Sequence, residues 1–167
     1  MLARTLVPMS DSTTTSHAAT TAAPTMATSA SPEALAAYFA TKLASETDAS
    51  DVRAAQKAGE DFALVDVRSA EAYAQGHAVG AIHMPYREIA ERAPREIPLD
   101  RPVVVYCWSP GCNAGAKGAL EFAKLGYQVR EMIGGFEYWA REGYAVDTAD
   151  GRAPRIVDAL VGTVAGR

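Results

Sequence analysis

The sequence predicts an α/β domain built on a parallel sheet. Short apolar runs typical of buried strands occur at residues 62–65 and 103–106, and residues 128–132 are a further strand candidate. Segments typical of short helices are found around and between these runs: residues 71–75, 86–92 and 114–125. Strands that alternate with helices along a chain favour a parallel sheet.

The first expected helix begins at Ser31. Serine is a good N-cap residue, Pro32 suits the first helical position, and Glu33 suits the first turn. Apolar side chains then recur at helical spacing: Leu35, Tyr38, Phe39 and Leu43. A second start signal at Ser50 predicts a short helix that ends at Gly59.

The elements nearer the C-terminus are also marked by glycine and proline. Residues 80–83 predict a brief strand, which Pro85 ends. We expect the helix at 114–125 to pack through one face, made of Ala116, Ala119, Leu120 and Ala123. The glycine turn at 134–135 leads into a further helix, in which we expect Trp139 to belong to the core.

Composition divides the chain into three parts. Nineteen of the first thirty residues are Ala, Ser or Thr, so we expect residues 1–30 to form a disordered leader. A targeting peptide and an artefact of start-site choice are the alternatives for this segment. Residues 31–148 form the α/β domain with its N-terminal helical extension. The tail at 149–167 has a weaker pattern, although 156–164 could form one or two helical turns.

Net charge and cysteine content exclude several classes of protein. The chain has 20 acidic and 16 basic residues and a net charge of -4, a poor balance for binding nucleic acid or an anionic membrane. No apolar run is long enough to cross a bilayer, so we expect a cytoplasmic protein with no membrane partner. The two cysteines, Cys107 and Cys112, exclude a disulfide scaffold and are too few for a zinc site.

Cys107 stands where an α/β domain carries its chemistry. It directly follows the expected strand at 103–106, and a short loop then leads into the helix that begins at Ala114. Ligands of open parallel sheets bind at the carboxyl ends of the strands. Backbone N–H groups of the loop and the helix N-terminus stabilise anions there, so we expect a lowered thiol pKa at Cys107.

Several motifs, taken in order, resemble the signatures of single-domain rhodanese-like proteins. They lie at residues 64–69, 71–85, 104–107, 126–127 and 134–139. The resemblance covers about residues 51–146. It implies a three-layer rhodanese-like domain, in which a central, mainly parallel sheet of five strands has helices on both faces.

The resemblance also implies an activity, the transfer of sulfane sulfur. In that family a cysteine thiolate takes sulfur from a donor as a persulfide and passes it to an acceptor nucleophile. By motif position Cys107 is the nucleophile, and loop amides cradle the persulfide or donor, the loop being Trp108, Ser109, Pro110, Gly111, Cys112 and Asn113. The implied partners are thiosulfate or a thiol persulfide as donor and a thiol or cyanide-like acceptor. The acceptor could also be a protein, and no cofactor or metal is implied.

The loop departs from the family pattern because it carries no arginine. The first basic residue after Cys107 is Lys117, so a charge-assisted hydrogen bond to an anionic donor is missing and thiosulfate binding should be weak. One alternative is therefore a catalytically weak or inactive domain that binds a ligand or senses redox state. Another is phosphatase-like or arsenate-reductase-like chemistry, which needs a cation near the position that Ala114 holds.

Other side chains near the expected site have two interpretations each. Cys112 could attack a persulfide or sulfenate on Cys107 and leave a disulfide, or it could pack at the helix N-terminus. Trp108 could form a wall of the pocket or pack within the loop. We expect Asp66 and Arg68 to pair in support of the site, and we expect His77 and His83 to be structural.

Overall fold

A computed structural model of the chain describes residues 30–163 and contains one central sheet of parallel strands. The strands lie in the order β1-β6-β5-β2-β4, and every pairing in this sheet is parallel. In chain order the elements are α1 (Pro32–Ser45), β1 (Glu46–Thr47), α2 (Ala49–Ala58), β2 (Ala63–Asp66), α3 (Ala70–Gln75), β3 (His77–Ala78), β4 (Ile82–His83), the 3-10 helix η1 (Tyr86–Glu88), α4 (Ile89–Glu96), β5 (Val103–Tyr106), α5 (Ala114–Lys124), β6 (Val129–Met132), α6 (Gly135–Arg141), β7 (Val146–Thr148) and β8 (Gly151–Ala153). The predicted parallel α/β fold is confirmed.

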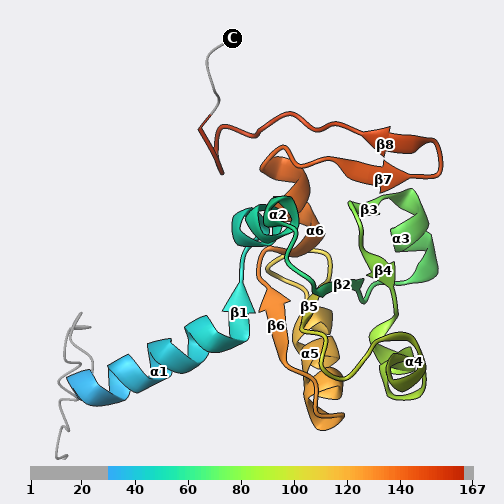
Figure 1. Cartoon of the computed structure of the whole chain (residues 1–167). Coiled ribbons are helices and arrows are strands. Elements are labelled where there is room, and N and C mark those ends of the chain that lie inside the picture. The colour runs from blue at the N-terminus through green and yellow to red at the C-terminus, as the bar shows by residue number, and fades with distance from the viewer. Residues whose placement is uncertain (1–29, 164–167) are drawn as a thin grey trace, which may run out of the picture.

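Helices cover both faces of the sheet, which makes three layers (Figure 1). On one face α4 and α5 pack against alternate strand residues, with Ile89 and Phe122 fully buried. On the other face α2 and α6 do the same, with Val52 and Trp139 in the core, as expected for Trp139. Strands β2 and β5 are buried along their whole length, because they are covered on both sides.

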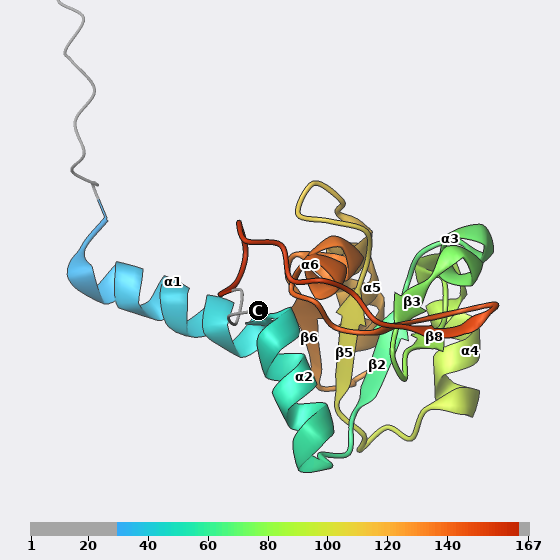
Figure 2. The ribbon, with the colours of Figure 1, turned by 90° about the horizontal axis from the view of Figure 1, so that it is seen from above.

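Helix α1 begins as predicted but stands apart from the domain. The Ser31 side chain accepts a hydrogen bond from the Ala34 N–H at 3.2 Å, and Pro32 is the first helical residue. None of its residues is buried, and Figure 2 shows the helix extending away from the sheet. Its apolar side chains are therefore exposed, Leu43 to 76%.

The predicted packing face of α5 is correct at Ala119, which packs against the core, and wrong at its other three residues. Leu120 is 54% exposed, whereas the buried residues of the helix are Gly115, Gly118 and Phe122. A Cβ atom on Gly118 would lie 2.9 Å from Cγ1 of Val67, so a larger residue there would press against Val67. Counting apolar side chains overlooks such a face, because glycine has no side chain to count.

The C-terminal part forms strands rather than a helix. Strands β3, β7 and β8 make a small antiparallel sheet that the sequence analysis did not predict. Of the one or two helical turns expected at 156–164, the described residues form one, in which the Asp158 carbonyl accepts from the N–H groups of Val161 and Gly162. Residues 154–158 have no regular secondary structure. Asp158 holds this segment to α6, because its carboxylate accepts a hydrogen bond from Arg141 Nε at 2.9 Å. The leader expected at 1–30 lies outside the described residues, apart from Ala30.

Candidate functional site

Cys107 lies at the carboxyl end of β5, the middle strand of the sheet. Strands β2 and β6 flank β5, so the loop that follows Cys107 leaves the centre of the sheet edge and enters α5. The cysteine is only 3% exposed. The loop folds back over it, and the Cys107 thiol donates a hydrogen bond to the carbonyl oxygen of Cys112 at 3.0 Å.

A hollow of about 420 Å³ opens beside this thiol. It is lined by residues from the loop, α1, α5 and β6 and from the turn after β6: Lys42, Cys107, Ser109, Pro110, Gly111, Cys112, Asn113, Ala116, Glu131, Met132, Ile133, Gly134 and Gly135. Every predicted loop residue except Trp108 is in this lining. The structure thus brings the two cysteines together in one cavity.

Trp108 lies outside that lining, is 41% exposed, and contacts Phe136 and Arg68. Its ring is edge-on to Phe136 of α6, with 6.2 Å between ring centroids. The Arg68 guanidinium carbon lies 4.3 Å from the Trp108 ring centroid and 4.2 Å from that of Phe136. These cation–π contacts hold the loop against α6.

The N-terminal amides of α5 each point to a different side chain. The N–H of Ala114 favours negative charge on the Cys112 sulfur, and the N–H of Gly115 favours negative charge on the Cys107 sulfur. The N–H of Ala116 favours negative charge on the carboxylate of Glu131. These first amides of a helix have no partner within the helix, so they are free to stabilise negative charge.

The loop amides complete the arrangement. The Ser109 N–H also favours negative charge on the Cys107 sulfur, and the Trp108 N–H favours it on the Cys112 sulfur. The Cys112 N–H takes no part, because it donates to the Ser109 carbonyl at 2.9 Å. Amides of both the loop and the helix thus favour negative charge on each sulfur.

The expected lowering of the Cys107 pKa is wrong. Burial, reinforced by the neighbouring Cys112 thiol, raises the pKa of Cys107 to about 11 despite the donated amides. At Cys112 burial also acts to raise the pKa, but the hydrogen bond from Cys107 and the two amides outweigh it, so the pKa is lowered. The helix amides favour the thiolate form, as expected. Because the pKa of Cys112 is lowered and that of Cys107 is raised, Cys112 is the first of the two to lose its proton.

Glu131 is a residue of the site that the sequence analysis missed. It lies on β6 and lines the hollow, and its carboxylate occupies the space that a side chain on Gly115 would need. Burial and the nearby Glu46 carboxylate raise its pKa, while the Ala116 amide opposes that shift. A carboxylate on a short strand next to the expected site was the signal for it.

Asp66 and Arg68 form an ion pair, as expected, and Arg68 contacts the loop through Trp108. Both side chains are buried, with Arg68 Nη2 2.6 Å from Asp66 Oδ2 and Arg68 Nε 2.9 Å from Asp66 Oδ1. Arg68 also donates to the Gly76 carbonyl at 2.7 Å, and the Tyr106 hydroxyl donates to Asp66 at 2.7 Å. The guanidinium that stacks on Trp108 is thereby fixed in place.

The two histidines make structural contacts. The His77 ring stacks on Tyr73 with 3.6 Å between centroids. The His83 ring nitrogen Nε2 lies 3.1 Å from the Arg68 carbonyl oxygen. Neither side chain lines the hollow beside Cys107.

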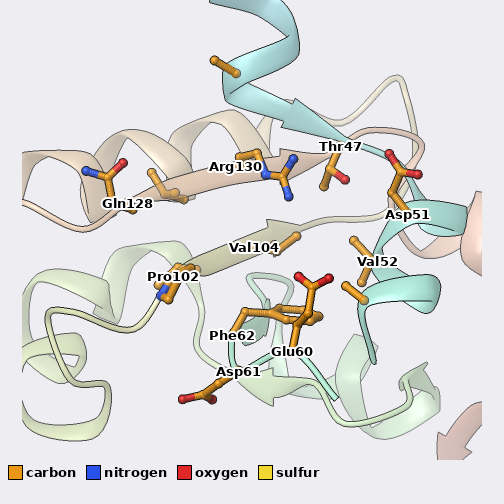
Figure 3. Close-up of a pocket in the computed structure, with 14 residues that line it drawn as sticks. Thr47, Asp51, Val52, Glu60, Asp61, Phe62, Pro102, Val104, Gln128 and Arg130 are labelled. Atoms are coloured by element: carbon orange, nitrogen blue, oxygen red, sulfur yellow. The ribbon is translucent and has the colours of Figure 1, made fainter. Parts of the chain in front are cut away.

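A second hollow, of about 300 Å³, lies near the amino-terminal ends of β5 and β6 (Figure 3). Thr47, Val52, Phe62, Val104 and Arg130 are among its lining residues. It contains neither cysteine and is separate from the Cys107 site.

Residues 30–163 contain neither a metal-ligand cluster nor a membrane-spanning helix. No three His, Cys, Asp or Glu side chains are grouped there in a way that could hold a metal ion. None of the described helices has the length and hydrophobicity to span a membrane.

Comparison with known proteins assigns the family. The model of the rhodanese-like domain family matches residues 48–142. The chain is similar to "Thiosulfate sulfurtransferase GlpE" of Pseudomonas entomophila (strain L48), 36% identical over 95 residues that cover 56% of this chain and 84% of that protein. It is also similar to "HTH-type transcriptional regulator Rv0324" of Mycobacterium tuberculosis, 39% identical over 93 residues that cover 55% of this chain and 40% of that protein.

Solved structures agree with this assignment. The BH2092 protein from Bacillus halodurans matches with a TM-score of 0.68 at 34% identity, covering 82% of this chain and 95% of that one. A thiosulfate sulfurtransferase from Pseudomonas aeruginosa matches with a TM-score of 0.56 at 29% identity, covering 61% of this chain and 19% of that one. The chain belongs to the rhodanese-like domain family.

Proposed function

We propose that the protein transfers sulfane sulfur through a persulfide on Cys107, with a thiol persulfide as the preferred donor. The observation that carries the proposal is the position of the Cys107 sulfur, at a central strand end, beside the N-terminus of α5 and on a hollow. The sulfurtransferase names of relatives support the reaction class.

The first step needs the Cys107 thiolate, and its proton has an acceptor in the adjacent Cys112 sulfur. The thiolate attacks the outer sulfur of a donor R–S–SH, the donor S–S bond breaks, and R–S⁻ leaves with the proton from Cys112. Cys107 then carries the outer sulfur as a persulfide. A nucleophile such as cyanide removes that sulfur as thiocyanate and regenerates the thiolate.

The charge around the hollow disfavours thiosulfate as the donor. Among the residues that line it, Lys42 is the one lysine or arginine, and its ammonium already pairs with Glu46. The Glu131 carboxylate takes the Ala116 amide, a position where a sulfonate could bind. A dianion would meet this carboxylate with no free cation in the lining, whereas a thiol persulfide carries less charge at the reacting end.

Thiocyanate formation tests the proposal. We expect cyanide and glutathione persulfide to yield thiocyanate faster with the protein than without it, and thiosulfate to give a kcat/KM lower by roughly tenfold or more, about 1.4 kcal/mol. Cys107→Ser should abolish the enzymatic rate. Leu120→Ser, a matched change on the exposed side of α5, should retain it.

Rates of Cys107→Ser equal to those of the wild type would refute the proposal. If no donor gives turnover and none leaves sulfur on the protein, the alternative of a non-catalytic binding or sensing domain is favoured instead.

A further inference from the structure

The two cysteines are free thiols that line the same cavity. Cys107 is buried, whereas Cys112 is partly exposed, so Cys112 is the more accessible of the two. The Cys107 thiol donates a hydrogen bond to the Cys112 carbonyl oxygen at 3.0 Å, so the loop brings the backbone of Cys112 directly onto the Cys107 sulfur. A short movement of this loop is enough to bring the two sulfurs to bonding distance.

Cys112 also has the surroundings of a nucleophile rather than of a packing residue. The amides of Trp108 and Ala114 and the nearby ammonium of Lys117 all favour negative charge on its sulfur, which lines the hollow. A cysteine that only filled space at the helix N-terminus would need neither the donors nor access to the hollow.

We propose that Cys112 is a resolving cysteine, which attacks the persulfide on Cys107 and releases its outer sulfur as hydrosulfide. This inference rests on the proposed function, because it requires the Cys107 persulfide. The Cys112 thiolate attacks the inner sulfur, the Cys107 Sγ. The bond between the inner and outer sulfur breaks, HS⁻ leaves, and a Cys107–Cys112 disulfide forms.

The electrons balance without any further reactant in that step. The persulfide carries the oxidation state that the donor delivered, its outer sulfur is reduced to hydrosulfide, and the two cysteines are oxidised to the disulfide. Hydrosulfide is a good leaving group because its conjugate acid is a stronger acid than an ordinary thiol. A second turnover needs a thiol or dithiol reductant, which can attack the disulfide at the partly exposed Cys112.

A single-turnover experiment tests the inference. The reduced full-length protein is mixed with one equivalent of glutathione persulfide, without cyanide or other reductant. Hydrosulfide is measured, and peptide mass mapping follows the two cysteines. We expect about one equivalent of hydrosulfide and a disulfide linking Cys107 to Cys112. A sample without donor should remain reduced, which excludes oxidation by air.

Two variants make failure of the inference distinct from failure of the proposed function. Cys112→Ser should keep the extra sulfur on Cys107 and release little hydrosulfide. Cys107→Ser should form neither a stable persulfide nor a disulfide. A wild-type protein that retains its persulfide as long as Cys112→Ser does would overturn the resolving role and leave the proposed function standing. If Cys112→Ser and the wild type both react without sulfur ever residing on Cys107, both proposals are wrong.

Discussion

Replacement of Arg68 by methionine tests whether its buried ion pair with Asp66 stabilises the domain next to the Cys107 loop. In Arg68→Met the Asp66 carboxylate, which is fully buried, loses the guanidinium that bonds both of its oxygens. It keeps the Tyr106 hydroxyl and one backbone N–H as donors. Removal of one partner of a buried ion pair lowers the free energy of unfolding by about 3–5 kcal/mol. That is a large part of the roughly 5–15 kcal/mol by which a domain of this size is stable.

The assay is urea unfolding of a double-mutant cycle made from Arg68→Met, Asp66→Asn and their combination. Asp66→Asn removes the charge but leaves an acceptor for the Tyr106 hydroxyl. We expect the double variant to be less destabilised than the sum of the single variants by at least about 2 kcal/mol, because no buried charge then lacks a partner. Additive losses, or a loss below about 1 kcal/mol for Arg68→Met, would refute the reasoning.

Three further predictions concern the charge of the hollow, the close packing of α5 and the thiol pair. Glu131→Gln should raise kcat/KM for thiosulfate by roughly threefold to tenfold, because relief of one carboxylate contact is worth about 1 kcal/mol in a partly solvated site; equal gains for thiosulfate and a thiol persulfide would contradict this. Gly118→Ala should lower the free energy of unfolding by about 1–2 kcal/mol, since the strain against Val67 exceeds the gain in helix propensity, and a more stable variant in urea unfolding would contradict it. Alkylation of Cys107 should accelerate as the pH rises toward about 11, because only the thiolate reacts and its pKa is raised, and in Cys112→Ser the acceleration should begin at lower pH. Peptide mapping after iodoacetamide should find Cys112 labelled first at neutral pH. Equal labelling of both cysteines would contradict the conclusion that Cys112 loses its proton before Cys107.

The central part of the fold could be predicted because its strands are buried on both faces. Such strands appear as unbroken apolar runs, and β5 spans the same residues, 103–106, that the sequence indicated. Strands β1 and β3 have only two residues each, which is too short for any periodicity. Their pairing depends on contacts with distant segments; for example, the Ala78 N–H donates to the Tyr106 hydroxyl at 3.0 Å.

The position of the site could be predicted from the sequence, but the direction of the Cys107 pKa shift could not. A strand end, a short loop and a helix start were enough to locate Cys107 and the five loop residues that line the cavity with it. The direction of its pKa shift depends on burial and on the hydrogen bond with Cys112, neither of which the spacing of two cysteines reveals. Glu131 was missed for a similar reason, because its approach to the α5 amides depends on the close packing of β6 and α5 at Gly115.

Mass mapping of Cys112→Ser after exposure to glutathione persulfide tests the central claim most directly, because this variant cannot resolve a persulfide internally. The account predicts a gain of one sulfur atom that maps to the peptide containing Cys107 and disappears when cyanide is added. It predicts no such gain when Cys107→Ser is combined with Cys112→Ser. A protein that gains no sulfur, or gains it on a peptide without Cys107, would contradict the assignment of Cys107 as the sulfur carrier.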